Sequence, residues 1–393
     1  MRDVVIVGSV RTPIGDFNGC FKTVPAVTLG ATAIEAAIER AGLTKNEVDE
    51  VIMGCVLPTG LGQNPARQAM IAAGLPMDGA AITVNKVCGS GLKAVMLGAQ
   101  AIACGDADVI VAGGMENMNQ APYYLDNARF GYRMGNAPVI DGMIHDGIWD
   151  VVNDIHMGHT AELVTEKFGI SREDMDRFAH MSIERTLDSI ARGRFKNEIV
   201  PVSVPQRRGD PLVTDTDETP RAMTMEELAR LRPAFKKEGG SVTAGNASKI
   251  SDGAAAVVLM EREAAGARGL DPIALVGAQA AAGMELEDVL VTPIKSIPKV
   301  LKKAGLELKD IDLFEINEAF ATSTVAIARE LGIAYDKLNV NGGAVALGHP
   351  IGASGTRVLV TLLAAMQQRG AQRGMASLCL GGAEAVSLIV ERL

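Results

Sequence analysis

The chain has 393 residues, of which 48% are hydrophobic and 22% charged. This composition excludes a disordered, coiled-coil or fibrous protein, and the length allows two or three domains of roughly 150 residues. The formal net charge of −9 and the lack of a run of lysines and arginines argue against a nucleic-acid surface. The 43 glycines exceed the usual ~7% of a chain and predict many tight turns and close backbone approaches.

The N-terminal residues give no sign of export or of insertion into a membrane. The opening segment MRDVVIVGSVRTP carries Asp3 and an apolar run too short for a signal peptide, and no stretch of 18 apolar residues follows it. Five scattered cysteines without a Cys-x-x-Cys pair argue against a disulfide framework and a zinc site. We therefore expect a cytoplasmic protein that binds neither a membrane nor a structural metal.

Two pairs of segments repeat one another along the chain. AGLTKNEVDEVIMG from Ala41 and AGLELKDIDLFEIN from Ala304 share Ala-Gly-Leu, then a Val/Ile-Asp pair, then an apolar run. Residues 83–85 and 339–341 each lead into a glycine-rich turn, a helix and a strand that ends near Gly-Gly. Helix, turn and strand in this order are typical of a wound α/β sheet. The repeats predict two similar α/β halves.

We predict an N-terminal half at residues 1–119 and a C-terminal half at 271–393. Residues 120–250 between them break the pattern and are predicted to form an inserted loop domain, whereas 251–270 complete the N-terminal half and connect it onward. The segment SREDMDRFAHMSIERTLDSIARG begins with a serine cap and has helical periodicity, so part of the insert is expected to be helical. Such long excursions usually cover or build a binding site.

Cys88 is the first candidate for chemistry. An apolar run ends at this cysteine, a Gly-Ser-Gly turn follows, and about fifteen helix-forming residues come next. A thiol just before a helix N-terminus is expected to have a lowered pKa, because the helix dipole and free N–H groups favour the thiolate. The alternative is a buried structural cysteine, and the sequence context leaves the two interpretations nearly even.

Three further positions follow predicted strands or glycine-rich turns. His349 lies between glycine clusters, where it is placed to act as a base or as a loop residue bonded to backbone. Cys379 ends an apolar strand in the second half, so it would face the same cleft as Cys88 if the halves pack about a pseudo-twofold axis, or else it is a core cysteine. Asn317 and Glu318 follow another strand, with an ordinary helix cap as the alternative.

Several long motifs identify a family. NKVCGSG, MENMNQAP, RPAF, AGNAS, NEAFA, GGAVALGHPIGASG and CLGG stand in the order found in the thiolase family, which the chain resembles over its whole length. ARFGYRMG, DGIWD and HMGHTAE in the insert are most similar to the short-chain biosynthetic type. The resemblance implies the thiolase fold, a five-layered α/β/α/β/α core of two similar βαβαβ-type halves with an inserted loop domain.

The resemblance also implies a reaction. It is a reversible condensation of two acetyl-CoA molecules to acetoacetyl-CoA and CoA, by a ping-pong mechanism through a cysteine thioester. A 3-ketoacyl-CoA thiolase of β-oxidation with longer substrates is the alternative within the family. A non-catalytic acyl-CoA-binding scaffold and a ketoacyl synthase of the same fold are alternatives of another kind. Cys379 argues against the synthase, and the complete set of reactive residues argues against the scaffold.

The family's site residues carry over to matching positions. The resemblance implies that Cys88 attacks the thioester and carries the acyl group, that His349 activates it, and that Cys379 exchanges a proton with the α-carbon of the second acetyl-CoA. Asn317 would hold a water that shares one oxyanion hole with His349. The backbone N–H groups of Cys88 and Gly381 would form the other.

Other implied positions concern the substrate and the assembly. Coenzyme A is substrate and product, with no metal or redox cofactor, and the assembly is a homotetramer built as a dimer of dimers. The implied CoA contacts are His156, Met157, Arg221, Phe235, Ser248 and Phe320.

The segment after Cys379 departs from the family pattern. Relatives usually continue with a third glycine, where this chain has Ala383 followed by Glu384. A methyl group at Ala383 would narrow the pocket or shift the strand that places Cys379. For Glu384 we favour a solvated position that mirrors Glu116 in the first half.

Overall fold

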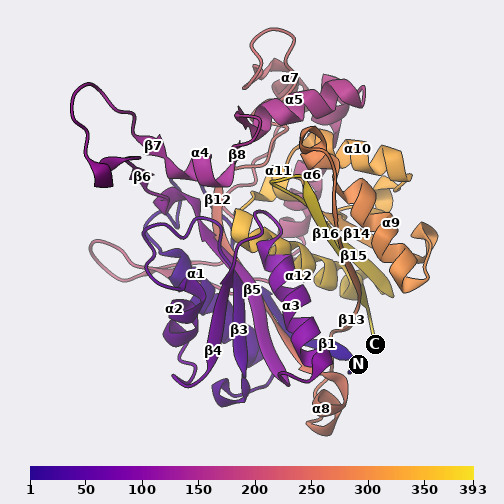
Figure 1. Cartoon of the computed structure of the whole chain (residues 1–393). Helices are drawn as coiled ribbons and strands as arrows, with labels where there is room; N and C mark the ends of the chain where they lie inside the picture. Colours follow the sequence, from indigo (N-terminus) through magenta and orange to yellow (C-terminus); the bar gives the residue numbers. More distant parts are fainter.

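The computed structural model describes residues 1–393 and contains one ten-stranded mixed sheet that runs through both halves of the chain (Figure 1). The strand order is β14-β15-β16-β13-β1-β12-β5-β3-β4, and the short β2 pairs with β12. The strands are β1 (Val4–Arg11), β2 (Gly15–Asp16), β3 (Glu50–Gly54), β4 (Ala80–Val84), β5 (Val109–Asn117), β12 (Ser251–Glu261), β13 (Ala274–Gly283), β14 (Leu313–Ile316), β15 (Arg373–Leu380) and β16 (Glu384–Glu391).

The two halves of this sheet repeat one another from the middle outward. β1, β12, β5 and β3 on one side correspond in order to β13, β16, β15 and β14 on the other. β1 pairs antiparallel with β13 through only two residue pairs, Val5 with Leu275 and Ile6 with Ala274. The counterpart of edge strand β4 is reduced to an isolated bridge between residues 314 and 338. The predicted pair of similar α/β halves is therefore confirmed.

Helices complete five layers. α3 and α12 pack against each other between the two half-sheets, α1 and α2 cover the outer face of the N-terminal half, and α9 with α10 beside it covers that of the C-terminal half (Figure 1). Three large clusters of buried hydrophobic side chains fill the spaces between these layers, as the predicted α/β/α/β/α core requires. The helices are α1 (Ala26–Arg40), α2 (Pro65–Ala72), α3 (Ser90–Cys104), α8 (Arg262–Ala267), α9 (Pro293–Ala304), α10 (Ala321–Leu331), α11 (Ala344–Leu347) and α12 (Ile351–Arg369), with 3₁₀ turns η1 (Lys45–Glu47), η4 (Leu286–Val291), η5 (Leu308–Asp310) and η6 (Tyr335–Lys337).

The central helix α3 bears on the expectation that the protein does not bind a membrane. The window Val87–Cys104 has a mean hydropathy of 1.4 and is long and apolar enough, by length and composition, to cross a membrane. In the fold this helix packs against α12, β5 and β3, and more than half of it is buried. Its apolar character is that of a core helix.

The predicted insert lies between β5 and β12, which pair antiparallel along most of their length. Its long helix α6 begins after Ser171, whose hydroxyl accepts a hydrogen bond from Asp174 N, and it coincides with the segment expected to be helical. A narrow arm around β6 and β7 projects from the body (Figure 1). The elements are η2 (Met118–Gln120), β6 (Tyr123–Tyr124), η3 (Ala128–Phe130), β7 (Ile140–Asp141), α4 (Gly142–Gly147), β8 (Trp149–Asp150), β9 (Ile155–His156), α5 (Met157–Lys167), α6 (Arg172–Ala191), β10 (Val202–Val204), β11 (Leu212–Thr214) and α7 (Met225–Arg230).

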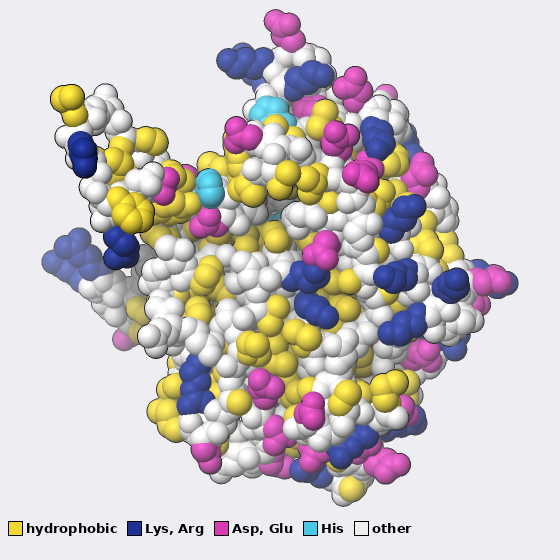
Figure 2. Space-filling model, viewed as in Figure 1, with side chains coloured by type: hydrophobic (Ala, Val, Ile, Leu, Met, Phe, Trp, Pro, Cys, Tyr) yellow, Lys and Arg dark blue, Asp and Glu magenta, His cyan; other side chains and the backbone are white.

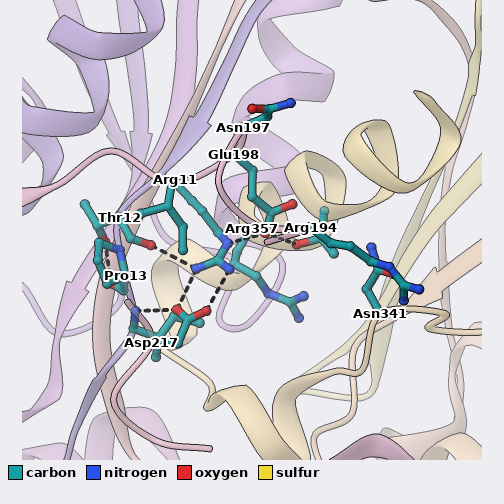
Figure 3. Close-up of polar contacts among 12 residues, drawn as sticks. Arg11, Thr12, Pro13, Arg194, Asn197, Glu198, Asp217, Asn341 and Arg357 are labelled. Atoms are coloured by element: carbon teal, nitrogen blue, oxygen red, sulfur yellow. Dashed lines mark hydrogen bonds and ion pairs between the residues drawn. The ribbon is translucent and has the colours of Figure 1, made fainter. Parts of the chain in front are cut away.

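A buried ionic network ties the insert to both halves (Figure 3). Arg11 of β1 donates to both carboxylate oxygens of Asp217, at 2.7 and 2.9 Å, and to Glu198 Oε1 at 2.6 Å. Thr361 of α12 donates to the same Glu198 oxygen at 3.2 Å. These four residues are buried and come from the N-terminal half, the insert and the C-terminal half. The three parts of the chain are thus fastened at one point.

Candidate active site

A cavity of about 410 Å³ is lined by residues of both halves and of the insert. Its wall is mostly hydrophobic, and it includes the predicted reactive residues Cys88, His349, Cys379 and Gly381. The repeated order of elements brings the strand ends of the two halves to this place, as the sequence suggested. No group of three or more His, Cys, Asp or Glu side chains is placed to hold a metal ion.

Cys88 lies in the turn between β4 and α3, as predicted, two residues before the helix begins. The preceding Val87 has φ +47°, a left-handed conformation that β-branched residues rarely adopt. Ser90 holds this turn, since its hydroxyl accepts from Lys86 N at 2.8 Å and donates to Val87 O at 2.6 Å. Backbone strain of this kind concentrates where a side chain must be held in one place.

The expectation that the helix terminus lowers the pKa of Cys88 is wrong. Burial raises that pKa to about 12, and the backbone N–H groups of Gly381 and of Cys88 itself oppose the effect only in part. Desolvation of a thiolate outweighs the helix dipole here because the sulfur is enclosed by mostly apolar walls. The resting thiol is therefore protonated and needs a base.

His349 supplies a neutral ring to the same cavity. The residue follows α11, and its backbone N–H donates to Lys249 O at 3.0 Å. Burial, with a smaller effect of the Arg357 charge, lowers the pKa of the imidazole to about 3. Nε2 lies 3.4 Å from Asn317 Nδ2, and Nδ1 lies 2.6 Å from Ser354 Oγ. A neutral imidazole has one free lone pair and can accept a proton.

Asn317 and Glu318 follow β14, and neither caps the next helix, because α10 begins after Phe320. The Oδ1 atom of Asn317 is buried and has no hydrogen-bond partner. Glu318 is also buried and accepts from Asn339 Nδ2 at 2.8 Å and from Val345 N at 3.0 Å. The carboxylate thus holds the loop that leads to His349, and the helix-cap alternative is wrong.

Cys379 lies on β15 and is 3% exposed. Burial raises the pKa of its thiol, and the nearby Cys88 raises it further. Cys379 belongs to the hydrophobic cluster of the C-terminal half, as the core-cysteine interpretation requires, but it also lines the cavity together with Cys88. Gly381 follows in the turn after β15, where an added Cβ would lie 3.0 Å from a methyl group of Val87.

The residues that depart from the family pattern lie beside the cavity. Ala383 has φ +57° and is buried, but it does not line the cavity, so its methyl group does not narrow the pocket. Glu384 is about half exposed and forms an ion pair with Lys86, in the turn before Cys88. The proposed likeness to Glu116 is wrong, because Glu116 is completely buried.

Five of the six predicted CoA contacts line the same cavity, namely His156, Met157, Phe235, Ser248 and Phe320. The His156 ring stacks on Phe235, with 4.9 Å between ring centroids. Arg221 does not line the cavity. Its exposed guanidinium forms an ion pair with Asp16, at 3.2 Å, and Asp16 does belong to the wall.

The sequence interpretation missed three residues around the site. Lys249, directly after AGNAS, lines the cavity, and burial lowers the pKa of its ammonium group. Glu116 accepts from the backbone N–H groups of Val56 at 3.0 Å, Leu57 at 3.1 Å and Gly352 at 2.9 Å. Ser354, in the first turn of α12, contacts His349 and is the third. All three lie within or beside the family motifs, and this position was the only sign in the sequence that they belong to the site.

Comparisons with known proteins agree with this geometry. The model of the thiolase N-terminal domain matches residues 4–263, and that of the thiolase C-terminal domain matches residues 270–392. An acetyl-CoA acetyltransferase of Pseudomonas aeruginosa is 55% identical over the full length of both chains, and a probable acetyl-CoA acyltransferase of Staphylococcus aureus is 49% identical over the same span. The crystal structure of the Bacillus anthracis acetyl-CoA acetyltransferase superposes with a TM-score of 0.98, at 42% identity, covering 100% of this chain and 99% of that one.

Proposed function

This chain belongs to the thiolase family, and we propose on that premise that it is an acetyl-CoA acetyltransferase with Cys88, His349, Cys379 and Asn317 as its reactive set. It transfers an acetyl group from one acetyl-CoA to the α-carbon of another, which gives acetoacetyl-CoA and CoA, and it catalyses the reverse reaction. The observation that carries the assignment of residues is the single cavity shared by two thiols and a neutral imidazole.

The first half-reaction acylates Cys88. Its sulfur attacks the thioester carbonyl while its proton passes to Nε2 of His349, and CoA leaves as the thiol with the proton of Cys379, which becomes a thiolate. A cysteine thioester is close in energy to the CoA thioester that it replaces, so the transfer is reversible. A serine ester would be more stable and would trap the acyl group.

The second half-reaction forms the carbon–carbon bond. Cys379, which is a thiolate after giving its proton to the departing CoA, removes a proton from the α-carbon of a second acetyl-CoA, and the resulting carbanion attacks the acyl group on Cys88. Collapse of the tetrahedral intermediate gives acetoacetyl-CoA and releases the sulfur of Cys88, which regains its proton from His349. In cleavage, Cys379 reprotonates the same carbon.

Two oxyanion holes support these steps. Asn317 holds a water that works in one of them with His349 once Nε2 carries the proton of Cys88, and the unpartnered Oδ1 of Asn317 supports this role. The backbone N–H groups of Cys88 and Gly381 form the other. Removing one such donor typically raises a barrier by about 3 kcal/mol, so the loss of Asn317 is expected to slow turnover less than the loss of Cys88.

The CoA chain lies against the cavity wall formed by the insert. His156 and Phe235 form a stacked surface there, with Met157, Ser248 and Phe320 beside it. We assign Arg221 to the phosphate end, outside the enclosed part, because its guanidinium is exposed and reaches Asp16 at the cavity rim. We also propose that residues 120–250 form the inserted loop domain between an N-terminal half at 1–119 and a C-terminal half at 271–393. Residues 251–270 complete the N-terminal half and connect it onward.

Separate variants of the two cysteines test the division of labour. Cys88→Ala is expected to form no acyl-enzyme with acetyl-CoA, because the nucleophile is missing. Cys379→Ala is expected to gain one acetyl group but to condense poorly, because only the second half-reaction needs this base. Intact-protein mass spectrometry after exposure to acetyl-CoA measures both. An unlabelled Cys379→Ala protein would contradict the assignment.

The length of the acyl chain separates this function from that of a degradative 3-ketoacyl-CoA thiolase. Thiolysis rates on C4 and C8 ketoacyl-CoA should favour C4. A clear preference for C8 would overturn the acetyltransferase assignment. A scaffold that only binds acyl-CoA would bind CoA but consume no acetoacetyl-CoA in the same assay.

We also propose a homotetramer, a dimer of dimers. β4 is an edge strand with the exposed apolar Ile82, and unpaired strand edges readily pair with a second chain. The arm around β6 and β7 carries exposed hydrophobic side chains and stands clear of the body (Figure 2). Light scattering of the wild type should give four copies of the 41.2 kDa chain, and replacing Phe130 and Met134 of the arm by serine should reduce that number. The cytoplasmic location stays a prediction, which cell fractionation tests.

A further inference from the structure

The hydroxyl group of Ser354 has two polar partners, both at the start of α12. Its Oγ atom lies 2.6 Å from Nδ1 of His349 and 2.9 Å from the carbonyl oxygen of Pro350. Ser354 is fully buried, so solvent water does not compete for either contact. The arrangement therefore determines where the hydroxyl proton and the imidazole proton reside.

The proton inventory allows one arrangement on the Nδ1 side. A serine hydroxyl has a single proton, and a carbonyl oxygen can only accept. If Ser354 donated to Nδ1, its oxygen would face the oxygen of Pro350 at 2.9 Å with no proton between them. Donation to Pro350 instead leaves a lone pair on Oγ, which accepts the proton of Nδ1 from His349.

The opposite side of the ring gives the same answer. Nε2 of His349 lies 3.4 Å from the Nδ2 atom of Asn317, and that amide nitrogen can only donate. A proton on Nε2 would set two donors against each other. An unprotonated Nε2 avoids this conflict, and its single lone pair, which faces the Asn317 amide at 3.4 Å in the resting site, is the one that takes the proton of Cys88. The backbone of His349 is held independently by Lys249 O, so the Ser354 contact controls the ring itself.

We propose that Ser354 is a positioning residue, which holds neutral His349 in the tautomer with a proton on Nδ1 and so keeps Nε2 free to accept the proton of Cys88. The inference rests on the proposed role of His349 as the base for Cys88. The lowered pKa of His349 supports it, because only a neutral ring has a tautomer to select. A ring free to change tautomer would spend part of its time with Nε2 already protonated and unable to act.

The tautomer can be measured directly on the wild-type protein. Nitrogen NMR of protein labelled with ¹⁵N-histidine should show a protonated Nδ1 and an unprotonated Nε2 for His349, assigned by the signal lost in His349→Asn. The chain has only five histidines, which keeps the assignment simple. A protonated Nε2 in the resting enzyme would overturn the inference. The measurement requires no turnover and no Ser354 variant.

Kinetics of Ser354→Ala provide the second test. We expect kcat and the single-turnover rate of Cys88 acetylation to fall together by about tenfold to hundredfold, part of the ~10²–10⁴ that a general base contributes. KM should change less than twofold, because the variant leaves the CoA wall intact, and the NMR signal should show both tautomers. Acetylation within twofold of the wild-type rate would contradict the inference.

Thr356→Val is the matched control. Thr356 lies two residues further along α12, is fully buried, and has a hydroxyl without a hydrogen-bond partner. Its loss tests whether any change of a buried hydroxyl in this helix slows the enzyme, and we expect kcat within twofold of the wild type. An equal slowing of both variants would overturn the specific role of Ser354. A wild-type enzyme that forms no acyl-enzyme would instead contradict the proposed function and leave the tautomer result standing.

Discussion

Two pKa values in one cavity define the chemistry at the scale of single residues. Burial raises the pKa of Cys88 to about 12 and lowers that of His349 to about 3. The resting site therefore holds a neutral thiol and a neutral imidazole in one cavity, rather than a thiolate–imidazolium pair. Proton transfer must therefore accompany the attack on the thioester, and the proposed oxyanion holes would stabilise the charge that develops.

The buried His349 makes stability depend on pH. Its pKa is about 3 in the folded chain and 6.5 without perturbation, so the unfolded chain binds more protons between these values. The stabilising contribution is fully present above pH 6.5 and is lost as the pH falls toward 3. Relative to His349→Asn, the wild type should lose about 1.4 kcal/mol of unfolding free energy on going from pH 7.5 to pH 5.5. Urea unfolding of both proteins measures this, and parallel pH profiles would contradict it.

The sequence placed Cys88, His349 and Cys379 in family motifs, and the three residues line one cavity in the structure. The repeat of the two halves suggested only that Cys379 would face the same cleft as Cys88, whereas His349 was joined to them through the thiolase motifs. The sequence interpretation gave the wrong direction for the pKa of Cys88, because local sequence shows the helix terminus but not the walls that enclose the sulfur. It placed Glu116 in solvent, because the partners that bury this carboxylate lie 59 to 236 positions away.

At the scale of elements, Glu116 joins β5 to the segment after β3 and to the start of α12. Its carboxylate accepts three backbone N–H groups from these segments, including that of Gly352. An added Cβ at Gly352 would lie 2.6 Å from the carboxylate, so only glycine lets the helix approach this closely. His349 and Ser354 flank the same helix start, so Glu116 fixes the platform that carries the proposed base.

Glu116→Gln should therefore destabilise the fold. The amide NH₂ would face backbone donors that a carboxylate oxygen now satisfies, and a buried unsatisfied donor costs about 1–3 kcal/mol. We expect the unfolding free energy in denaturant titrations to fall by that amount, together with kcat. Glu384→Gln is the control, because its half-exposed ion pair with Lys86 contributes about 0–1 kcal/mol. Equal stability losses in the two variants would contradict this account of Glu116.

In the whole molecule, β1 and β13 join the two halves of the sheet through only two residue pairs, so other contacts must hold the halves together. The central layer of α3 and α12 supplies apolar contact, and Arg11 supplies the polar fastening to the insert and, through Glu198, to α12. Buried ion pairs add little net stability compared with apolar packing, but removing one partner is costly because the other charge stays buried. The network therefore makes the three parts dependent on one another.

Arg11→Met should reduce the unfolding free energy by about 3–5 kcal/mol, because Glu198 and Asp217 would remain buried without their cation. Arg2→Met removes the exposed pair with Asp108 and should cost about 0–1 kcal/mol. Denaturant unfolding of both variants, under conditions where the wild type is fully folded, makes the comparison. Similar losses in the two variants would show that the network does not fasten the three parts.

The pH dependence of Arg11→Met distinguishes lost charge pairing from lost packing. Burial already raises the pKa of Glu198 above its usual value, and loss of the Arg11 charge, which lowers it, should raise it further. A carboxyl whose pKa is raised by folding destabilises the fold most when pH exceeds both values, and the penalty disappears as pH falls below the unfolded pKa near 4.5. The stability difference between the wild type and Arg11→Met should therefore shrink on going from about pH 7.5 to about pH 5. A difference that stays constant would assign the loss to packing of the arginine side chain instead.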